Sequence, residues 1–196
     1  MWALIEDSEI VKIINNPKAM VIGDTRYSKN IFSFRWTDEE REAIGLYEIV
    51  CDNSNKEDEA YYTNTNHSFD FADGVATASF GSATAKELDD VTDEDDNVTD
   101  GLKTKHKRII KNQASGLLTP TDWYILKATD VESYEVPSAV STFRTNVRTK
   151  SNTMETAIDN AADVDALATL YEYVNTGTEE NPVMERPLGE WPELEV

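Results

Sequence analysis

The sequence has few of the residues that catalysis and metal binding most often use. It holds one cysteine, Cys51, and two histidines, His67 and His106, among 196 residues. A single cysteine excludes an intrachain disulfide framework and a cysteine-rich zinc site, and it fits folding in a reducing compartment. No pattern of nucleophiles surrounds either histidine, so nothing indicates a triad or dyad. We therefore expect structural roles for both histidines and a chain that is not an enzyme.

Positive charge is also scarce. The chain carries 18 Lys and Arg against 38 Asp and Glu, a formal net charge of −20. Such a charge repels phosphate backbones and anionic lipid surfaces, so we expect neither a nucleic-acid nor a membrane partner. No apolar run approaches the roughly 18 residues of a membrane span, and the first residues contain no basic leader. The one basic cluster, Lys103 to Lys111, suits a helix that pairs with the acidic residues preceding it.

Cofactor and cation motifs are missing as well. The eight glycines are scattered and form neither a phosphate-binding loop nor a dinucleotide fingerprint. Asp93, Asp95 and Asn97 imitate the start of a calcium loop, but Val98 and Thr104 stand where such a loop requires glycine and glutamate. We therefore expect no metal and no cofactor. A glycosidase remains a competing hypothesis that would need two carboxylates roughly 5 to 9.5 Å apart in a cleft.

The N-terminal part has the short alternating runs of an antiparallel sheet. Trp2 to Ile5 and Ile10 to Ile14 predict one hairpin, and His67 to Phe71 with Val75 to Phe80 predict a second around an Asp-Gly turn. Between them, Thr37-Asp38-Glu39-Glu40 is a capping box that starts a short helix, which Gly45 ends. Leu46 to Val50 then returns as a strand.

The C-terminal part has helical periodicity. It predicts a helix ending near Gly116, a second with Thr119 as N-cap and Pro120 at its first position, a third opening at Pro137, and a fourth capped by Asp163. The fold class is α+β. The expected divisions are an antiparallel α+β domain (1–86), an acidic linker (87–100), a helical hairpin or bundle (101–175) and an extended tail rich in proline and glutamate (176–196).

Two stretches carry a resemblance to a known family. Leu118-Thr119-Pro120-Thr121-Asp122-Trp123-Tyr124, then Val136-Pro137, then Thr142 to Arg148, resemble the C-terminal region of tailed-bacteriophage tail-fibre assembly proteins. Residues Met1 to Ala85 look like a module of uncharacterised marine-phage proteins that also carry such helices. The resemblance implies a protein of the host cytoplasm during assembly and of the virion tail, which contacts a tail-fibre or baseplate protein and possesses no enzymatic activity.

Six residues are candidates for partner binding, because aromatic and arginine side chains dominate binding energy at interfaces. They are Trp191, Trp123, Tyr124, Phe143, Arg144 and Arg148. Trp123 and Phe143 lie on apolar stripes, which favours the helical core, whereas the arginines are expected to be exposed. Trp191, between Pro187 and Pro192, has no evident local core and is the better contact candidate. A transient assembly chaperone, an unrelated cytoplasmic binding module and a homo-oligomer remain open alternatives.

Overall fold

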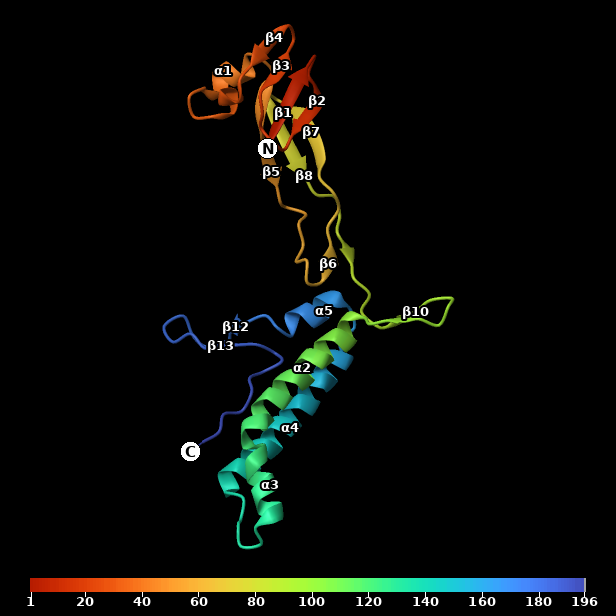
Figure 1. Ribbon diagram of the computed structural model, residues 1–196, viewed down its shortest axis with the longest axis vertical. Helices are drawn as coiled ribbons and strands as arrows, with labels where there is room; N and C mark the ends of the chain where they lie inside the picture. The colour runs from red at the N-terminus through yellow and green to blue at the C-terminus, as the bar shows by residue number, and fades with distance from the viewer. Residues whose placement is uncertain (196) are drawn as a thin grey trace. The chain divides into compact units, whose positions relative to one another are not determined.

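The computed structural model describes residues 1–195, and the chain divides into two compact units, Met1–Thr84 and Ala85–Val196 (Figure 1). The division lies two residues before residue 86, where the sequence analysis ends the first domain. The first unit is built on a sheet and the second on helices, so the expected α+β class is confirmed.

The first unit contains a five-stranded sheet of order β2-β1-β5-β8-β7. Its strands are β1 (Trp2–Glu6), β2 (Glu9–Ile14), β5 (Leu46–Asp52), β7 (Ser68–Ala72) and β8 (Val75–Ser79). Both expected hairpins are confirmed, β1 with β2 and β7 with β8. Positive φ at Asp7 and Ser8, and at Asp73 and Gly74, gives each two-residue turn the twist that matches its strands. The pairing of β5 with β8 is parallel, which the sequence analysis did not predict.

Both faces of this sheet are covered by apolar side chains. One face buries Ala3, Ile5, Ile49, Ala76 and Ala78. The other buries Trp2, Ile14 and Leu46 with Ile31, which belongs to the segment between β2 and β5. That segment contains β3 (Met20–Ile22), β4 (Thr25–Tyr27), the 3₁₀ helix η1 (Lys29–Phe32) and α1 (Asp38–Glu42). Two short strands complete the N-terminal series, β6 (Tyr62–Thr63) and β9 (Thr84–Ala85).

The capping box of α1 is confirmed. Thr37 Oγ1 accepts from the Glu40 amide at 3.2 Å, and Glu40 Oε2 accepts from the Thr37 amide at 2.9 Å. Gly45 follows the helix with φ +75°, and a Cβ at this position would collide with the carbonyl oxygen of Ile5. The Ile5 amide donates to the Gly45 carbonyl at 2.7 Å, so a backbone hydrogen bond joins the turn after the helix to β1.

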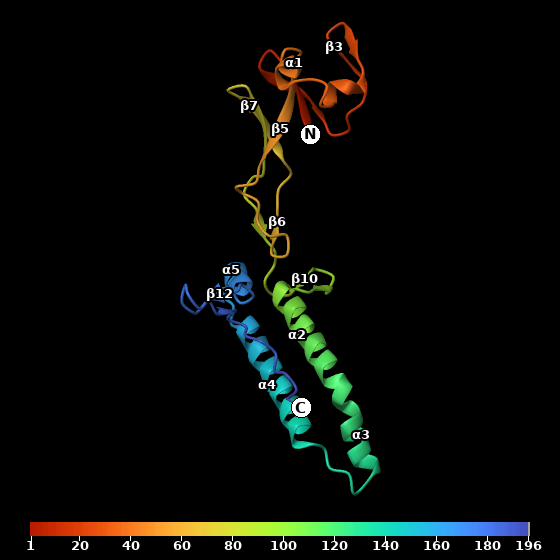
Figure 2. The ribbon, with the colours of Figure 1, turned by 90° about the vertical axis from the view of Figure 1, so that its left-hand side faces the viewer.

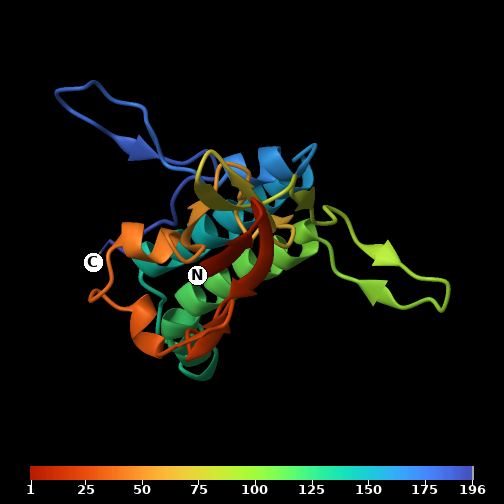
Figure 3. The same ribbon diagram turned by 90° about the horizontal axis from the view of Figure 1, so that it is seen from above.

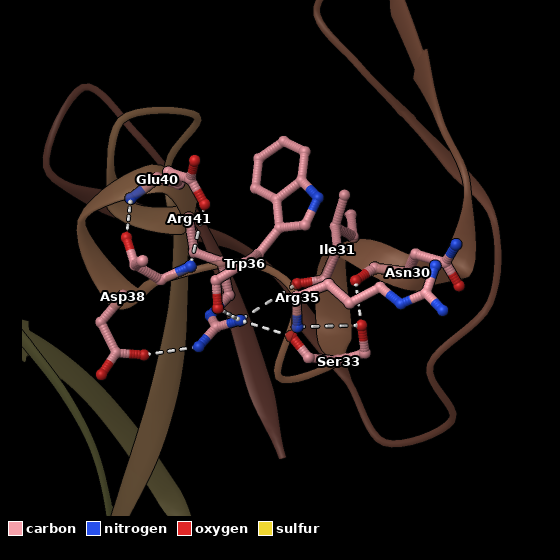
Figure 4. Close-up of polar contacts among 9 residues, drawn as sticks. Asn30, Ile31, Ser33, Arg35, Trp36, Asp38, Glu40 and Arg41 are labelled. Carbon is pink, nitrogen blue, oxygen red and sulfur yellow. Dashed lines mark hydrogen bonds and ion pairs between the residues drawn. The ribbon is translucent and has the colours of Figure 1, made fainter.

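Arg41 of α1 is buried and holds the same segment together (Figure 4). Its guanidinium donates to the carbonyl oxygens of Ser33 and Trp36 at 3.1 and 2.7 Å and pairs with Asp38 at 2.6 Å. It also lies 5.0 Å from the centre of the Trp2 ring. A buried arginine whose terminal nitrogens donate to several carbonyl oxygens of one segment is a structural clamp, because these hydrogen bonds tie the segment together within the fold.

The second unit is centred on two long helices, α2 (Leu102–Leu118) and α4 (Ser138–Asp159), which lie side by side (Figures 1 and 2). Their shared face buries Leu102, Ile110 and Ala114 from α2 and Val140, Phe143, Val147, Met154 and Ile158 from α4. The remaining elements are η2 (Thr119–Thr121), α3 (Asp122–Asp130), α5 (Val164–Thr169), β10 (Val91–Thr92), β11 (Val98–Thr99), β12 (Val174–Asn175) and β13 (Met184–Glu185). The expected cap of α5 is confirmed, because Asp163 Oδ1 accepts from the Ala166 amide at 2.8 Å.

The first long helix ends near Gly116, as predicted, but the predicted N-cap of the next helix is wrong. α2 runs past Gly116 to Leu118 and continues through η2 into α3. Thr119 has helical backbone angles, and its hydroxyl donates to the Ser115 carbonyl at 2.8 Å, so it is not an N-cap. Pro120 is tolerated because it lies in the 3₁₀ turn that joins the two helices.

The acidic segment 87–100, predicted to be a linker, contains regular structure that its composition did not predict. Val91 and Thr92 pair with Thr99 and Val98 as the hairpin of β10 and β11, which projects from the helices in Figure 3. Asp93 closes its turn by accepting at Oδ1 from the amides of Asp95 and Asn97, both at 2.9 Å. This turn chemistry supplies the order that apolar burial does not.

The same segment also caps α2. The carbonyl oxygens of Glu87 and Leu88 accept from the first amides of the helix, and Asp90 Oδ1 accepts from the Gly101 amide at 2.7 Å. Cations of the helix offset the local repulsion, with Lys103 3.1 Å from Asp89 and Arg108 2.7 Å from Asp100. The expected pairing of the acidic run with the basic cluster is therefore present.

Candidate protein interface

The six residues predicted to bind a partner fall into two groups in the structure. Trp123 and Arg148 are exposed and Tyr124 is half-buried. Phe143 and Arg144 are buried at 7% exposure each, and Trp191 packs against the helices of its own chain. Only the first group is therefore open to contact as the chain stands.

Trp123 belongs to a helix of the second unit that exposes several large apolar side chains. The side chains of Trp123, Ile125 and Leu126 are 50%, 41% and 66% exposed, and none of the nine residues of α3 is buried in the part of the chain that the structure describes. The expectation that Trp123 lies in the helical core is therefore wrong. The apolar residues of α3 do recur with helical periodicity. However, the face on which α2 and α4 pack against each other does not extend to α3.

Aromatic contacts order the exposed face of α3. The rings of Trp123 and Tyr124 are 3.8 Å apart between centroids. The ammonium of Lys127 lies 5.9 Å from the Trp123 ring and 4.3 Å from the Tyr134 ring. Such contacts restrict side-chain rotation before binding, which lowers the entropy lost when a partner covers the surface.

Arg144 fixes the start of α3, and the expectation that it is exposed is wrong. Its guanidinium donates to Thr121 Oγ1 at 2.6 Å and to the Leu118 carbonyl at 3.0 Å, and it pairs with Asp122 Oδ1 at 2.8 Å. The arginine is buried because the junction between α2 and α3 offers it acceptors from three residues. Its effect on any partner is indirect, through the placement of α3.

Phe143 and Trp191 form one packed cluster instead of two contact sites. Phe143 packs with Ala114 and Val147, and Trp191 lies against them. The indole nitrogen of Trp191 donates to Gln113 Oε1 at 3.1 Å. Trp191 has no core close to it in sequence, as expected, but it packs on a core that α2 and α4 supply from earlier in the chain, so the expectation that it is a free contact residue is wrong. The tail predicted from residue 176 onward is correspondingly not simply extended, because β13 within it pairs with β12, which immediately precedes it.

The two histidines each lie against an aromatic ring. The His67 ring lies 4.2 Å from that of Phe80, and the His106 ring lies 4.8 Å from that of Tyr171. Burial lowers the pKa of His106. Cys51 is exposed. Within residues 1–195 no three His, Cys, Asp or Glu side chains are grouped to hold a metal ion, and no helix is both long and apolar enough to cross a membrane.

Comparison with protein-family profiles, with curated proteins and with solved structures gives no match to this chain. What this chain can bind must therefore be inferred from its own residues. In the second unit these residues present α3 to solvent and use Arg144 to hold it in place.

Proposed function

We propose that this chain is a non-enzymatic bacteriophage tail protein, associated with the tail fibres, that acts through protein–protein contacts. The observation that carries the proposal is the exposure of Trp123, Ile125 and Leu126 on one short helix. The resemblance of the segment around Thr121-Asp122-Trp123 to tail-fibre assembly proteins supports a fibre or baseplate partner.

The physical case for binding at α3 is its residue content. Tryptophan and tyrosine are enriched among the residues that dominate binding energy, and several large apolar side chains on one helix suit a groove on a partner. Isolated exposed apolar residues are ordinary on protein surfaces, but three within four positions on a helix with no buried residue are not. The ion pair of Arg144 with Asp122 places the helix before binding, which favours recognition by a rigid surface.

A binding assay with purified fibre protein tests this surface. Trp123→Ala and Leu126→Ala are each expected to weaken binding by about tenfold or more, because such truncations remove central apolar contacts. Ile109→Ala is the matched control, since Ile109 is also an exposed apolar residue, at 47%, but belongs to α2. Equal binding by all three variants would remove α3 from the proposal.

The proposal has two forms that differ in where the protein finally resides. A virion component stays on the tail, whereas a transient assembly chaperone acts in the host cytoplasm and leaves. Mass spectrometry of purified particles against infected-cell lysate separates them: a fixed ratio to the fibre protein in particles indicates a component, and presence in lysate alone indicates a chaperone. If the chain associates with no phage protein in either sample, an unrelated cytoplasmic binding module becomes the better interpretation.

A further inference from the structure

The last residues of the chain fill an apolar surface formed by two helices. Ala114, Leu117 and Leu118 of α2 and Phe143 and Val147 of α4 make this surface, which we call the docking patch, and Trp191 and Leu194 pack against it. Trp191 also donates a hydrogen bond to Gln113 beside the patch. Earlier in the tail, Leu188 is only 3% exposed, and its amide donates to the Leu170 carbonyl at 3.0 Å.

The residues that connect this segment to the preceding helix are weakly packed. Every residue from 172 to 185 is exposed. Its regular structure is the hairpin of β12 and β13, with two residues in each strand, and a hairpin of this size is marginal in water. When extended, these residues span roughly 45 Å. The docked segment is therefore a well-packed unit on a tether that can open at little cost.

We propose that the docking patch is a binding site for an extended Trp-Pro-Glu-Leu segment, and that a second copy of the chain supplies residues 191–194 when copies are held close together. The contacts made within one chain are equally available between two chains, so local concentration decides which form prevails. A short flexible tether corresponds to an effective concentration on the order of millimolar, so copies held at a comparable local concentration are expected to exchange tails. The inference concerns the docking patch alone and stands whether or not α3 binds a tail fibre.

Two point variants of the full chain test the exchange by complementation. Trp191→Ala removes the main anchor of the segment and leaves the docking patch vacant. Leu117→Asp places a carboxylate in the patch and releases an intact segment. Leu117 is half-buried, so this change is tolerable for the helix. Mixed at about 1 mM each, near the effective concentration of the tether, the two variants are expected to form a complex of twice the 22.0 kDa chain mass in light scattering, whereas each variant alone stays at that mass.

A matched control replaces Trp191→Ala by Trp123→Ala, which truncates a tryptophan outside the docking patch. Its own tail competes for its patch, so it is expected to give clearly less complex with Leu117→Asp than Trp191→Ala gives. A mixture of Trp191→Ala with Leu117→Asp that stays at the single-chain mass, while both variants keep native helical circular dichroism, would overturn the inference. A complex formed equally well with Trp123→Ala would overturn it too.

A peptide provides a second measurement in case Leu117→Asp does not fold. The synthetic peptide of residues 186–195 is titrated into the Trp191→Ala chain, with the same peptide carrying Trp191→Ala as control. Binding of the first peptide at least tenfold tighter than the second is the expected result. Equal binding, or none at millimolar peptide, would show that the patch does not recognise this segment.

Discussion

At the scale of single residues, arginines one helical turn apart have different environments. Arg144 and Arg148 both lie on α4, yet Arg144 is buried and Arg148 is exposed. The acceptors that draw Arg144 inward, the Leu118 carbonyl and Thr121 Oγ1, lie more than twenty positions earlier in the chain. Local periodicity contains no information on such contacts, so the sequence could not predict which arginine is structural.

This difference predicts unequal costs of truncation. Arg144→Ala is expected to lower the free energy of unfolding of the second unit by roughly 2 to 3 kcal/mol, since it removes a buried side chain and its hydrogen bonds to Thr121 Oγ1 and the Leu118 carbonyl. The half-exposed Asp122 adds little to that figure because water screens the ion pair. Arg148→Ala, the matched control, is expected to change it by less than about 0.5 kcal/mol. Urea unfolding monitored by helical circular dichroism measures both, and equal losses would contradict the assignment.

Truncation of Phe143 and of Trp123 is also expected to have different effects on stability. Phe143→Ala is expected to cost about 3 to 5 kcal/mol of stability, as for a buried aromatic, whereas Trp123→Ala is expected to cost less than about 1 kcal/mol because half of its side chain is exposed. Thermal unfolding of the two variants measures this difference. A large loss for Trp123→Ala would mean that α3 is packed and is not a free binding surface.

At the scale of elements, what the sequence predicted correctly is local. The hairpin turns at Asp7-Ser8 and Asp73-Gly74 and the capping box at Thr37 are decided by neighbouring residues, and each is confirmed. The acidic hairpin was missed because the prediction for these residues rested on their composition. Residues 87–100 are ordered by turn bonds and by cations of α2, and composition alone counts only their repulsion.

The cap of α2 predicts a dependence of stability on pH. The hydrogen bond from the Gly101 amide, with a further bond from Thr104, holds the pKa of Asp90 below its ordinary value of 3.8. A carboxyl whose pKa is lowered by folding stabilises the fold above its unfolded pKa, and this contribution is lost as pH falls through the folded pKa. Asp90→Asn is therefore expected to be less stable than the natural chain at pH 7, and the difference is expected to close below pH 3.8.

Melting temperatures of both chains from pH 7 to pH 3 test this prediction. Asp93→Asn is an informative comparison, because Asp93 also has a lowered pKa but accepts its hydrogen bonds within the hairpin turn, from Asn97 and Asp95. It is expected to loosen the hairpin without fraying α2, as observed by amide exchange at the start of the helix. An Asp90→Asn difference that persists unchanged at pH 3 would contradict the role of the Asp90 carboxylate.

At the scale of the whole molecule, the sequence predicted the class of fold better than the state of its candidate site. The sequence analysis ended the first domain at residue 86, and the first unit ends at Thr84, whereas the second unit also includes the acidic residues 87–100. The candidate site depended on which aromatic side chains remain open, and that is decided by packing between segments distant in sequence. Trp191 shows this most clearly, since the residue that it hydrogen-bonds, Gln113, lies 78 positions earlier.

The division into Met1–Thr84 and Ala85–Val196 predicts that each unit folds alone, because each contains its own buried core. Gly45→Ala probes the first unit: positive φ and a collision with the Ile5 carbonyl are expected to cost about 2 kcal/mol. Arg144→Ala probes the second. In calorimetry of the full chain, each variant is expected to lower one transition and leave the other in place, as for independent sites. Dispersed amide spectra from residues 1–84 and 85–196 expressed separately would agree with this, and a shift of both transitions by either variant would show instead that the units fold as one.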